Sequence, residues 1–329
     1  MQFFSHNKGV WLKGALHIHT TNSDGLLSPE KAVEFYKKHG YGFLSITDHN
    51  KITEVKNGLP VIKGIEVNTG KNDLGYEYHV VIIGVEDYPP KEIRNCVQSL
   101  IDWARDNGCF VFVAHPYWSM LSMHDLLKLN GYYAIEVFNT LAEVEISRGY
   151  SGPHWDFLLQ SGRRVDAVAV DDVHYYTIDV LGGWVMVNTR SPDVESILDA
   201  LKNGKYYSSS GPLVKKLEYG NGELCIETTP IQTVKIYSGG MRGMYFSAPV
   251  SPRSKPIISP FAEEIEEEKG KAEYNLYART RSGMEFEFSV NRERVSLKLK
   301  GLSKWLKGFV RIEIIDEDGK SAWLNPLYL

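Results

Sequence analysis

The sequence is poor in cysteine, carries a small net charge and contains no long apolar run. Its three cysteines, Cys96, Cys109 and Cys225, are widely spaced and form no Cys-x-x-Cys pair. This spacing argues against a disulfide framework and a thiolate metal site, and it favours unpaired thiols in a reducing compartment. A net charge of -4 at pH 7 gives no reason to expect nucleic acid or an anionic membrane as a partner.

Signals for membrane insertion and secretion are also missing. No segment approaches the roughly 18 consecutive apolar residues of a membrane-spanning helix. The N-terminal stretch "MQFFSHNKGVWLKG" lacks the charged-then-apolar order of a signal peptide. We therefore expect a cytoplasmic protein that contacts no membrane and forms no stable nucleic-acid complex.

The composition and length are those of a globular protein with one large domain or two ordinary ones, since 43% of the 329 residues are hydrophobic and 24% are charged. Apolar, strand-like segments alternate with helical ones up to about residue 212. The predicted strands are 14–20, 42–50, 59–67, 78–86, 109–118, 133–139 and 165–174. The predicted helices begin at Ser28-Pro29, within 90–108, and at Ser191-Pro192. Strands rich in Val and Ile between helices predict a parallel sheet with helices outside, and we favour an α/β distorted barrel over a doubly wound sheet.

The texture changes after residue 212. Short segments of alternating polarity, separated by Gly or Asp-Gly turns, predict a small all-β, sandwich-like domain. The stretch 247–270, rich in proline and then in glutamate, predicts a solvated loop. We therefore expect two domains, a metallohydrolase barrel at 1–212 and a β-domain at 213–329.

Side chains that can bind metals lie at the ends of the predicted strands of the first half. His17 and His19 stand two apart in an extended segment, which places both imidazoles on one face about 6.6–6.8 Å apart. The alternative for this pair is a solvated strand end. The full set is His17, His19, Asp24, Asp48, His49, Glu66, His79, His115, Glu136, Asp172 and His174. The C-terminal ends of barrel strands meet at one face, so these side chains are expected to converge there.

His79 and Asp171 differ from these residues in their position within the predicted strands. His79 lies near the start of its segment, so its position in the strand supports it least. The spacing Asp172-x-His174 repeats the same-face geometry of the histidine pair, and Asp171 then faces the other way. We interpret Asp171 as a carboxylate that supports a ligand or caps a loop.

The motifs "HIHTTNSDG", "ITDHN", "GIE", "AHP" and "DDVH", in this order between residues 14 and about 211, resemble those of the PHP (polymerase and histidinol phosphatase) superfamily. With "YYSSSGP" and the C-terminal β-domain, the arrangement is similar to the CehA/McbA-like branch. The resemblance implies a distorted (β/α)7 barrel with three divalent ions. It implies His17, His19, Glu66 and Asp172 for the first ion, Glu66, His79 and His115 for the second, and Asp24, His49 and His174 for the third. Asp48 is interpreted as structural or as support for a ligand.

Imidazole and carboxylate ligands without thiolate suit Zn, Mn or Fe. We expect two to three ions and a metal-bridging hydroxide, with Glu66, Asp172 and His174 as the catalytic residues. The charge of three divalent ions exceeds that of their carboxylates and a hydroxide, which favours a small anionic substrate, above all a phosphate monoester or diester.

Substrate contacts are assigned to Lys51, Tyr117, Asn139 and Arg148. The alternatives are surface charges for Lys51 and Arg148, core packing for Tyr117 and the adjacent Trp118, and a buried polar pair for Asn139 and Glu136. Two other functions stay open, namely hydrolysis of a carbamate, amide or ester by the same centre, and a non-catalytic metal-binding regulatory protein. The β-domain could bind carbohydrate, cover the site or form a homo-oligomer.

Overall fold

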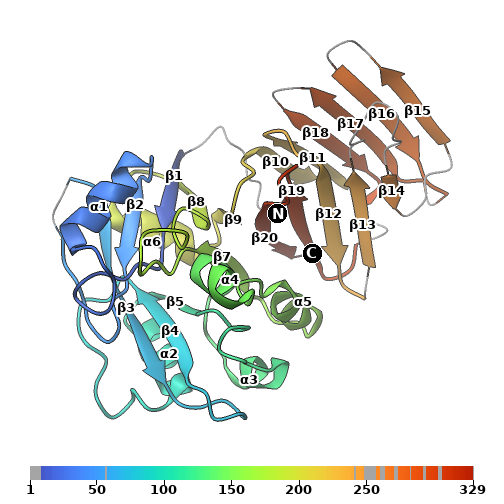
Figure 1. The fold of residues 1–329 in the computed structure, drawn as a ribbon. Helices are drawn as coiled ribbons and strands as arrows, with labels where there is room; N and C mark the ends of the chain where they lie inside the picture. The colour runs from blue at the N-terminus through green and yellow to red at the C-terminus, as the bar shows by residue number, and fades with distance from the viewer. Residues whose placement is uncertain are drawn as a thin grey trace. The chain divides into compact units, whose positions relative to one another are not determined.

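The computed structural model describes residues 9–55, 58–240, 242–247, 257–259, 264–269, 273–281, 283–291, 294–302 and 306–328. The chain forms two compact units, one spanning Gly9–Ser208 and one of later residues that begins at Ser209. Figure 1 shows the first unit in blue to yellow and the second in yellow-brown to red. The predicted domain limits place the boundary a few residues later, and they include residues 1–8 and 329, which lie outside the described residues.

The strands of the first unit are β1 (Val10–Ala15), β2 (Phe43–Ile46), β3 (Val61–Thr69), β4 (Tyr78–Ile83), β5 (Phe110–Val113), β6 (Ala134–Asn139), β7 (Asp166–Val170), β8 (Trp184–Thr189) and β9 (Tyr206–Ser209). They lie in the order β9-β8-β1-β2-β3-β4-β5-β6-β7. Each of the seven predicted segments contains a strand or continues one, whereas β8 and β9 were not predicted. β9 is short and has the sequence YYSS, which carries little apolar alternation, whereas β8 is as long as β1, at six residues.

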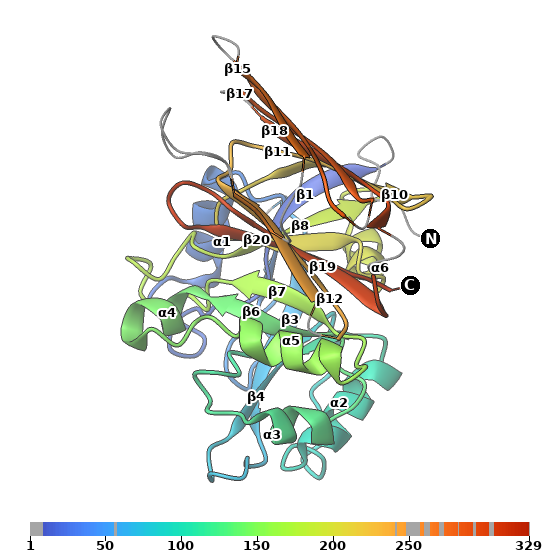
Figure 2. The same cartoon turned by 90° about the vertical axis from the view of Figure 1, so that its right-hand side faces the viewer.

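The helices are α1 (Pro29–Lys38), α2 (Val97–Asp106), α3 (Met123–Lys128), α4 (Thr140–Ile146), α5 (Gly152–Gln160) and α6 (Val194–Lys202). α1 starts as predicted, with Ser28 as N-cap and Pro29 in the first turn. α6 is capped by Asp193, whose side chain accepts a hydrogen bond from the Ser196 backbone N–H, so the predicted start at Ser191 is too early. α4 and α5 pack against β6 (Figures 1 and 2).

The sheet is mixed, and the prediction of an all-parallel sheet is wrong. β1, β2 and β3 are parallel, as are β5, β6 and β7, but β4 is antiparallel to β3 and β5 and β8 is antiparallel to β1. A parallel pair needs a crossover of a dozen residues or more, and the short loop between Thr69 and Tyr78 allows only a reversal. The start of β4 therefore lies at the same edge as the ends of β3 and β5.

Strands from both ends of the sheet in this unit, which runs from β9 to β7, contribute to one hydrophobic core. It includes Leu16, Phe43, Val81, Val168 and Val185, all fully buried. Ser208 also hydrogen-bonds the backbone of Ala167 and Ala169 in β7. The sheet is thus curved around a common interior. The closed sevenfold alternation of a (β/α)7 barrel stays a prediction.

The second unit is built on two antiparallel sheets (Figure 2). The strands are β10 (Val214–Gly220), β11 (Glu223–Thr228), β12 (Thr233–Ser238), β13 (Arg242–Ser247), β14 (Ile257–Ser259), β15 (Glu264–Lys269), β16 (Glu273–Arg279), β17 (Glu285–Asn291), β18 (Val295–Lys300), β19 (Phe309–Ile315) and β20 (Ser321–Tyr328). The rings of Phe246 in β13 and Phe286 in β17 lie 4.9 Å apart and join the sheets. The acidic stretch forms β15 at a sheet edge, so the prediction of a loop is wrong there; its paired backbone prevails over its charge.

No helix among the described residues has both the length and the apolar character needed to cross a membrane.

A glycine-to-alanine change tests the tight approach between β7 and the segment before β8. A Cβ on Gly183 would lie 2.4 Å from the Val170 carbonyl oxygen and 2.7 Å from its nitrogen. Gly183→Ala is therefore expected to lower the free energy of unfolding by about 1–3 kcal/mol, as overpacking does, measured by urea denaturation. Gly243→Ala is the control, because the nearest atom to its Cβ is 4.0 Å away. Equal stability of the two variants would contradict this account.

Candidate metal centre

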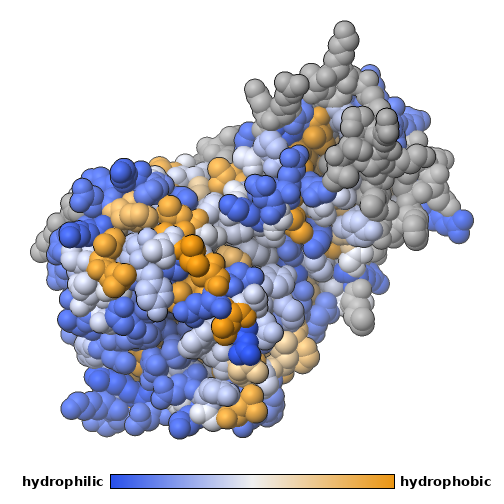
Figure 3. All heavy atoms as spheres, viewed as in Figure 1, coloured by the Kyte–Doolittle hydropathy of each residue, from blue (hydrophilic) through white to orange (hydrophobic). Residues whose placement is uncertain are grey.

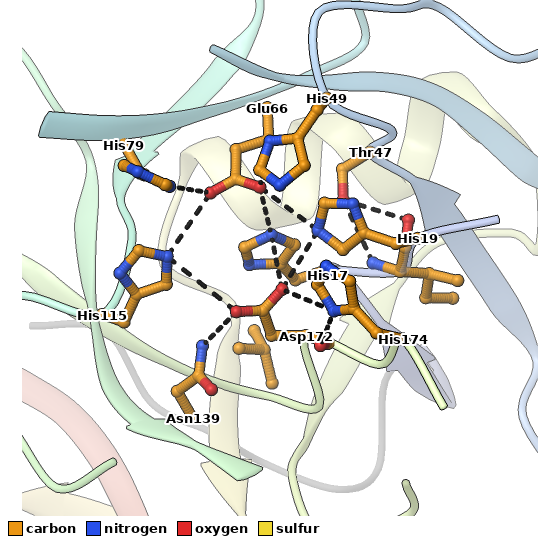
Figure 4. Close-up of polar contacts among 12 residues, drawn as sticks. His17, His19, Thr47, His49, Glu66, His79, His115, Asn139, Asp172 and His174 are labelled. Carbon is orange, nitrogen blue, oxygen red and sulfur yellow. Dashed lines mark hydrogen bonds and ion pairs between the residues drawn. The ribbon is translucent and has the colours of Figure 1, made fainter. Parts of the chain in front are cut away.

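The structure brings the nine predicted ligands together in three adjoining groups. The groups are His17, His19, Glu66 and Asp172; then Glu66, His79 and His115; then His19, Asp24, His49 and His174. Within each group, the candidate ligand atoms all lie within 4.8 Å of one another. Figure 4 shows the side chains converging on the carboxylates of Glu66 and Asp172. The structure adds His19 to the third group, since its second ring nitrogen faces Asp24 at 3.5 Å.

The first group has the dimensions of a closed cation site. The Nε2 atom of His17 lies 3.1 Å from Glu66 Oε2 and 3.2 Å from Asp172 Oδ1. For His19 Nε2 the corresponding distances are 3.2 and 3.0 Å. Two ligands of a tetrahedral ion at about 2.1 Å lie about 3.4 Å apart. All four atoms are buried and none has a hydrogen-bond partner of suitable geometry, so the residues present fit a divalent metal ion.

Glu66 joins the first group to the second. Its Oε1 atom lies 2.8 Å from His79 Nδ1 and 3.4 Å from His115 Nε2. Its Oε2 atom also lies 3.2 Å from His49 Nδ1, and His49 belongs to the third group. Each oxygen of this carboxylate thus faces a different group, which is the arrangement of a bridging ligand.

The third group is the most open. Asp24 Oδ2 lies 3.4 Å from His174 Nε2 and 3.6 Å from His49 Nε2. The Asp24 side chain is 52% exposed, whereas Glu66 is 1% exposed. Because the Asp24 carboxylate is in contact with solvent, the third group lies at the solvent-exposed side of the centre.

Local backbone pairing explains why the two histidines after β1 share a face. The Ile18 N–H donates to Thr47 Oγ1 and the Thr47 N–H donates back to the Ile18 carbonyl oxygen. On the other side, the His19 N–H donates to the Val173 carbonyl oxygen. This held, extended backbone directs His17 and His19 to the site, as their spacing predicts, while Ile18 packs into the core.

The direction of β4 explains why His79 belongs to the site although it lies at the start of a strand. Its position at the start of a strand would place it far from the site in a parallel sheet. Because β4 runs antiparallel to β3, His79 pairs with Asn68, just beyond Glu66. Its own N-terminal end therefore lies at the edge where the other ligands meet.

Glu136 supports the site from behind, a role that the sequence analysis did not assign to it. It is fully buried and accepts hydrogen bonds from His17 Nδ1 at 2.7 Å, the His115 N–H at 2.7 Å and Asn139 Nδ2 at 2.8 Å. A proton on His17 Nδ1 leaves the Nε2 lone pair free to bind a metal. The sequence offered its place at a strand end and the alternative of a buried polar pair with Asn139, and the hydrogen bond between these two buried residues confirms that alternative.

Asn139, predicted to contact substrate, faces Asp172 instead. Its amide donates to Asp172 Oδ2 at 3.0 Å as well as to Glu136, and its carbonyl oxygen accepts from the Ala142 N–H at the start of α4. These bonds use both N–H groups of the amide. Asn139 therefore orients a ligand, because it has no donor left for a substrate and its side chain is fully buried.

Two further buried aspartates hold the ligand-bearing loops. Asp48 accepts from the Thr20 N–H and hydroxyl and from the Ser23 hydroxyl, at 2.7–2.8 Å, next to Asp24. Asp171 accepts from the Tyr36 hydroxyl at 2.7 Å and from the backbone N–H groups of residues 181–183, each at 2.9 Å. Asp171 points away from the ligands, as the alternation predicts, and connects residues 181–183 to Tyr36 in α1.

A cavity of about 230 Å³ opens onto the three groups. Seven of the ligands line it, together with Trp118, Leu141, Ala142, Glu145 and Tyr175. The other predicted substrate contacts, Lys51, Tyr117 and Arg148, are not among its lining residues. The Arg148 guanidinium lies over the Tyr117 ring at 5.8 Å. The described lining contains no lysine or arginine.

When no cation is bound, protons on the imidazoles compensate the negative charges of the carboxylates. Burial opposes the charged form of His19, but the Asp172 and Glu66 carboxylates outweigh it and raise its pKa to about 9. Burial would likewise raise the pKa of Glu66, yet the surrounding histidines, led by His17, hold it well below its usual range. A metal ion must therefore displace protons from the imidazoles.

A comparison with a solved protein supports the fold described above. No family model matches the sequence. A two-domain protein from Bacteroides vulgatus ATCC 8482, described as containing a predicted PHP-like metal-dependent phosphoesterase, superposes with a TM-score of 0.52 at 14% identity, over 99% of this chain and 98% of that one. An amidohydrolase from Chromobacterium violaceum gives a TM-score of 0.41 at 15% identity, over 51% of this chain and 89% of the other.

A short segment also matches the DNA polymerase/3'-5' exonuclease PolX of Bacillus subtilis (strain 168), with 46% identity over 48 residues. The match spans 15% of this chain and only 8% of that protein. The chain thus has the fold of the two-domain Bacteroides protein, to which it is similar along its whole length.

The pKa shift of His19 leads to a pH dependence of stability. Its pKa in the folded protein, about 9, is above the ordinary value of about 6.5. Protonated His19 thus stabilises the metal-free fold fully below pH 6.5, and this contribution is lost as the pH rises to about 9. We expect the urea midpoint of chelator-treated protein to fall over this interval. A midpoint that stays level or rises would contradict the assignment.

Removing the charge of Glu136 is expected to weaken metal binding without unfolding the chain. Glu136→Gln should raise the apparent dissociation constant for Zn or Mn about 10- to 100-fold, because the carboxylate no longer orients His17. Competition with a chromophoric chelator measures it. Asp125→Asn is the control, since Asp125 is an equally buried carboxylate that accepts bonds from Ser122 and Asp73 outside the three groups. Unchanged affinity in Glu136→Gln would show that Glu136 has no part in the site.

Proposed function

We propose that the chain is a metal-dependent hydrolase of the PHP type that cleaves phosphate esters. The observation that carries this proposal is the convergence of four buried atoms, the Nε2 atoms of His17 and His19 and one oxygen each of Glu66 and Asp172, with nitrogen–oxygen distances of 3.0–3.2 Å. None of the four makes a hydrogen bond of suitable geometry, and a bound cation accounts for their arrangement. The shared fold with the Bacteroides protein supports the same proposal.

Two to three divalent ions, of Zn, Mn or Fe, are the proposed cofactors. Such ions lower the pKa of water and stabilise negative charge on a phosphoryl oxygen. Glu66 sets the spacing of the first two groups because it presents one oxygen to each. Asp172 completes the first group, and His174 directs its Nε2 atom toward Asp24 because its Nδ1 atom faces the Asp172 carbonyl oxygen at 2.8 Å. These three residues are the proposed catalytic residues.

The cavity's charge bears on the choice of substrate. Three divalent ions would leave positive charge over after their carboxylates and a hydroxide are counted, which favours an anionic substrate. Glu145 lines the cavity and Glu136 lies behind His17, so two further carboxylates offset much of this excess. This offset is the observation that keeps carbamate, amide or ester hydrolysis as the second candidate. A non-catalytic role is disfavoured, because every proposed ligand position holds a residue able to bind metal.

The decisive experiment combines metal analysis with an activity screen. We expect two to three ions per chain by elemental analysis, and hydrolysis of 4-nitrophenyl phosphate or its bis ester with inhibition by inorganic phosphate. The same reconstituted protein is tested on nucleotides, aryl carbamates and aryl esters. Fewer than one ion per chain after Mn or Zn reconstitution would defeat the metal centre. Carbamate or ester cleavage that phosphate leaves unchanged would favour the second candidate.

Glu66→Gln is expected to reduce kcat at least a hundredfold, because the neutral amide cannot bridge two ions as a carboxylate does. The fold should persist, since the apolar core of the unit is built from other residues. Circular dichroism and kcat with saturating Mn measure the two effects. Glu77→Gln is the matched control on the exposed loop before β4. Turnover of Glu66→Gln near that of the wild type would show that Glu66 is not the bridge.

A further inference from the structure

Two aromatic side chains stand at opposite ends of the row of ligand groups. The Trp118 indole lies edge-on to the second group, with ring centroids 4.9 Å from His115 and 5.8 Å from His79. The Tyr175 ring lies 6.2 Å from His174 of the third group. Both side chains line the cavity, yet they are 37% and 52% exposed. Each therefore presents ring surface to whatever enters.

Both rings are carried by ordered turns. The turn after His115 is closed by a hydrogen bond from the Ser119 N–H to the His115 carbonyl oxygen, and Asn72 donates to the Ser119 carbonyl oxygen. On the other side, the buried carboxylate of Asp179 accepts bonds from the N–H groups of His174 and Tyr175, at 2.8 and 2.6 Å. Rings carried by such a fixed backbone can stack on a flat group without a large loss of side-chain entropy.

The rest of the cavity lining is uncharged or negative apart from the ligands. Leu141 and Ala142 provide apolar contact, and Glu145 provides a carboxylate. Beside Tyr175, Leu26 is 64% exposed and its N–H donates to the His174 carbonyl oxygen, which places another apolar side chain near this end. Figure 3 shows that apolar residues also gather in patches on the visible face of this unit. Away from the ligand groups, a substrate with several negative charges would meet Glu145 with no lysine or arginine in the described lining.

We propose that Trp118 and Tyr175 select a monoanionic phosphodiester whose ester group carries a planar aromatic ring. The phosphoryl group would lie at the ligand groups, with an aromatic ester group on the face of Trp118 or Tyr175. Water cleaves the P–O bond to the other ester group, so that the products are a phosphate monoester that keeps this aromatic ring and the alcohol or phenol of the group that leaves. This inference rests on the proposed phosphoesterase function and names the substrate class of that same site.

The test compares two monoanions with the same leaving group, bis(4-nitrophenyl) phosphate and ethyl 4-nitrophenyl phosphate, on Mn-loaded protein. Wild-type protein is expected to prefer the bis ester about tenfold in kcat/KM, which corresponds to about 1.4 kcal/mol. Trp118→Ala and Tyr175→Ala should reduce this preference mainly through KM, and Trp118→Phe should restore most of it. Tyr117→Ala is the matched control, because Tyr117 is the equally exposed neighbour of Trp118 that does not line the cavity.

Binding without turnover separates this inference from the proposed function. Titration calorimetry with diphenyl phosphate and diethyl phosphate should show tighter binding of the diphenyl ester that Trp118→Ala abolishes. If neither phosphate monoesters nor diesters are cleaved but this binding difference is found, the aromatic site stands and the phosphoesterase proposal fails. If diesters are cleaved with the same preference by wild type, Trp118→Ala and Tyr175→Ala, the inference is overturned. An equal effect of Tyr117→Ala would also overturn it, since it would reflect the turn rather than the ring.

Discussion

The arrangement of the candidate metal centre depends on one buried carboxylate, that of Glu66, surrounded by histidines. Its two oxygens lie within 3.4 Å of nitrogens from five imidazoles, those of His17, His19, His49, His79 and His115. A carboxylate that is 1% exposed is tolerated only if it is paired. Protons on the imidazoles or bound cations can do this, so the state of the centre is coupled to both pH and metal.

A layer of polar groups behind the ligands holds this arrangement in place. Glu136 orients His17, Asn139 orients Asp172, and Asp48 and Asp171 tie down the loops on either side. The backbone also adopts positive φ at two ligands, 25° at His115 and 55° at Asp172. Such conformations cost roughly 1–3 kcal/mol, and the surrounding hydrogen bonds offset them. The ligand positions are thereby set before a metal or substrate arrives.

Two carboxylates near the ligands also change the charge around the cavity. If only the charges of the ligands are counted, three divalent ions would leave a net positive charge, which suits a highly charged phosphate. Glu136 and Glu145 add carboxylates, and the described lining contributes no lysine or arginine. The aromatic rings of Trp118 and Tyr175 then become the main surfaces available to the remainder of a substrate. Charge and shape together thus support the proposed substrate, a singly charged group with an aromatic neighbour.

The sequence by itself determined the features that depend on local periodicity. His17 and His19 share a face and Asp171 faces away from Asp172, because neighbouring residues of an extended chain alternate in direction. The start of α1 follows from Ser28 and Pro29 for an equally local reason. Only the tertiary structure decided which distant groups meet. Antiparallel β4 brings His79 to Glu66, and Glu136 reaches His17 across 119 residues of chain. It also decided that Trp118 rather than Tyr117 lines the cavity, because the path of a turn depends on the residues that hydrogen-bond it from elsewhere.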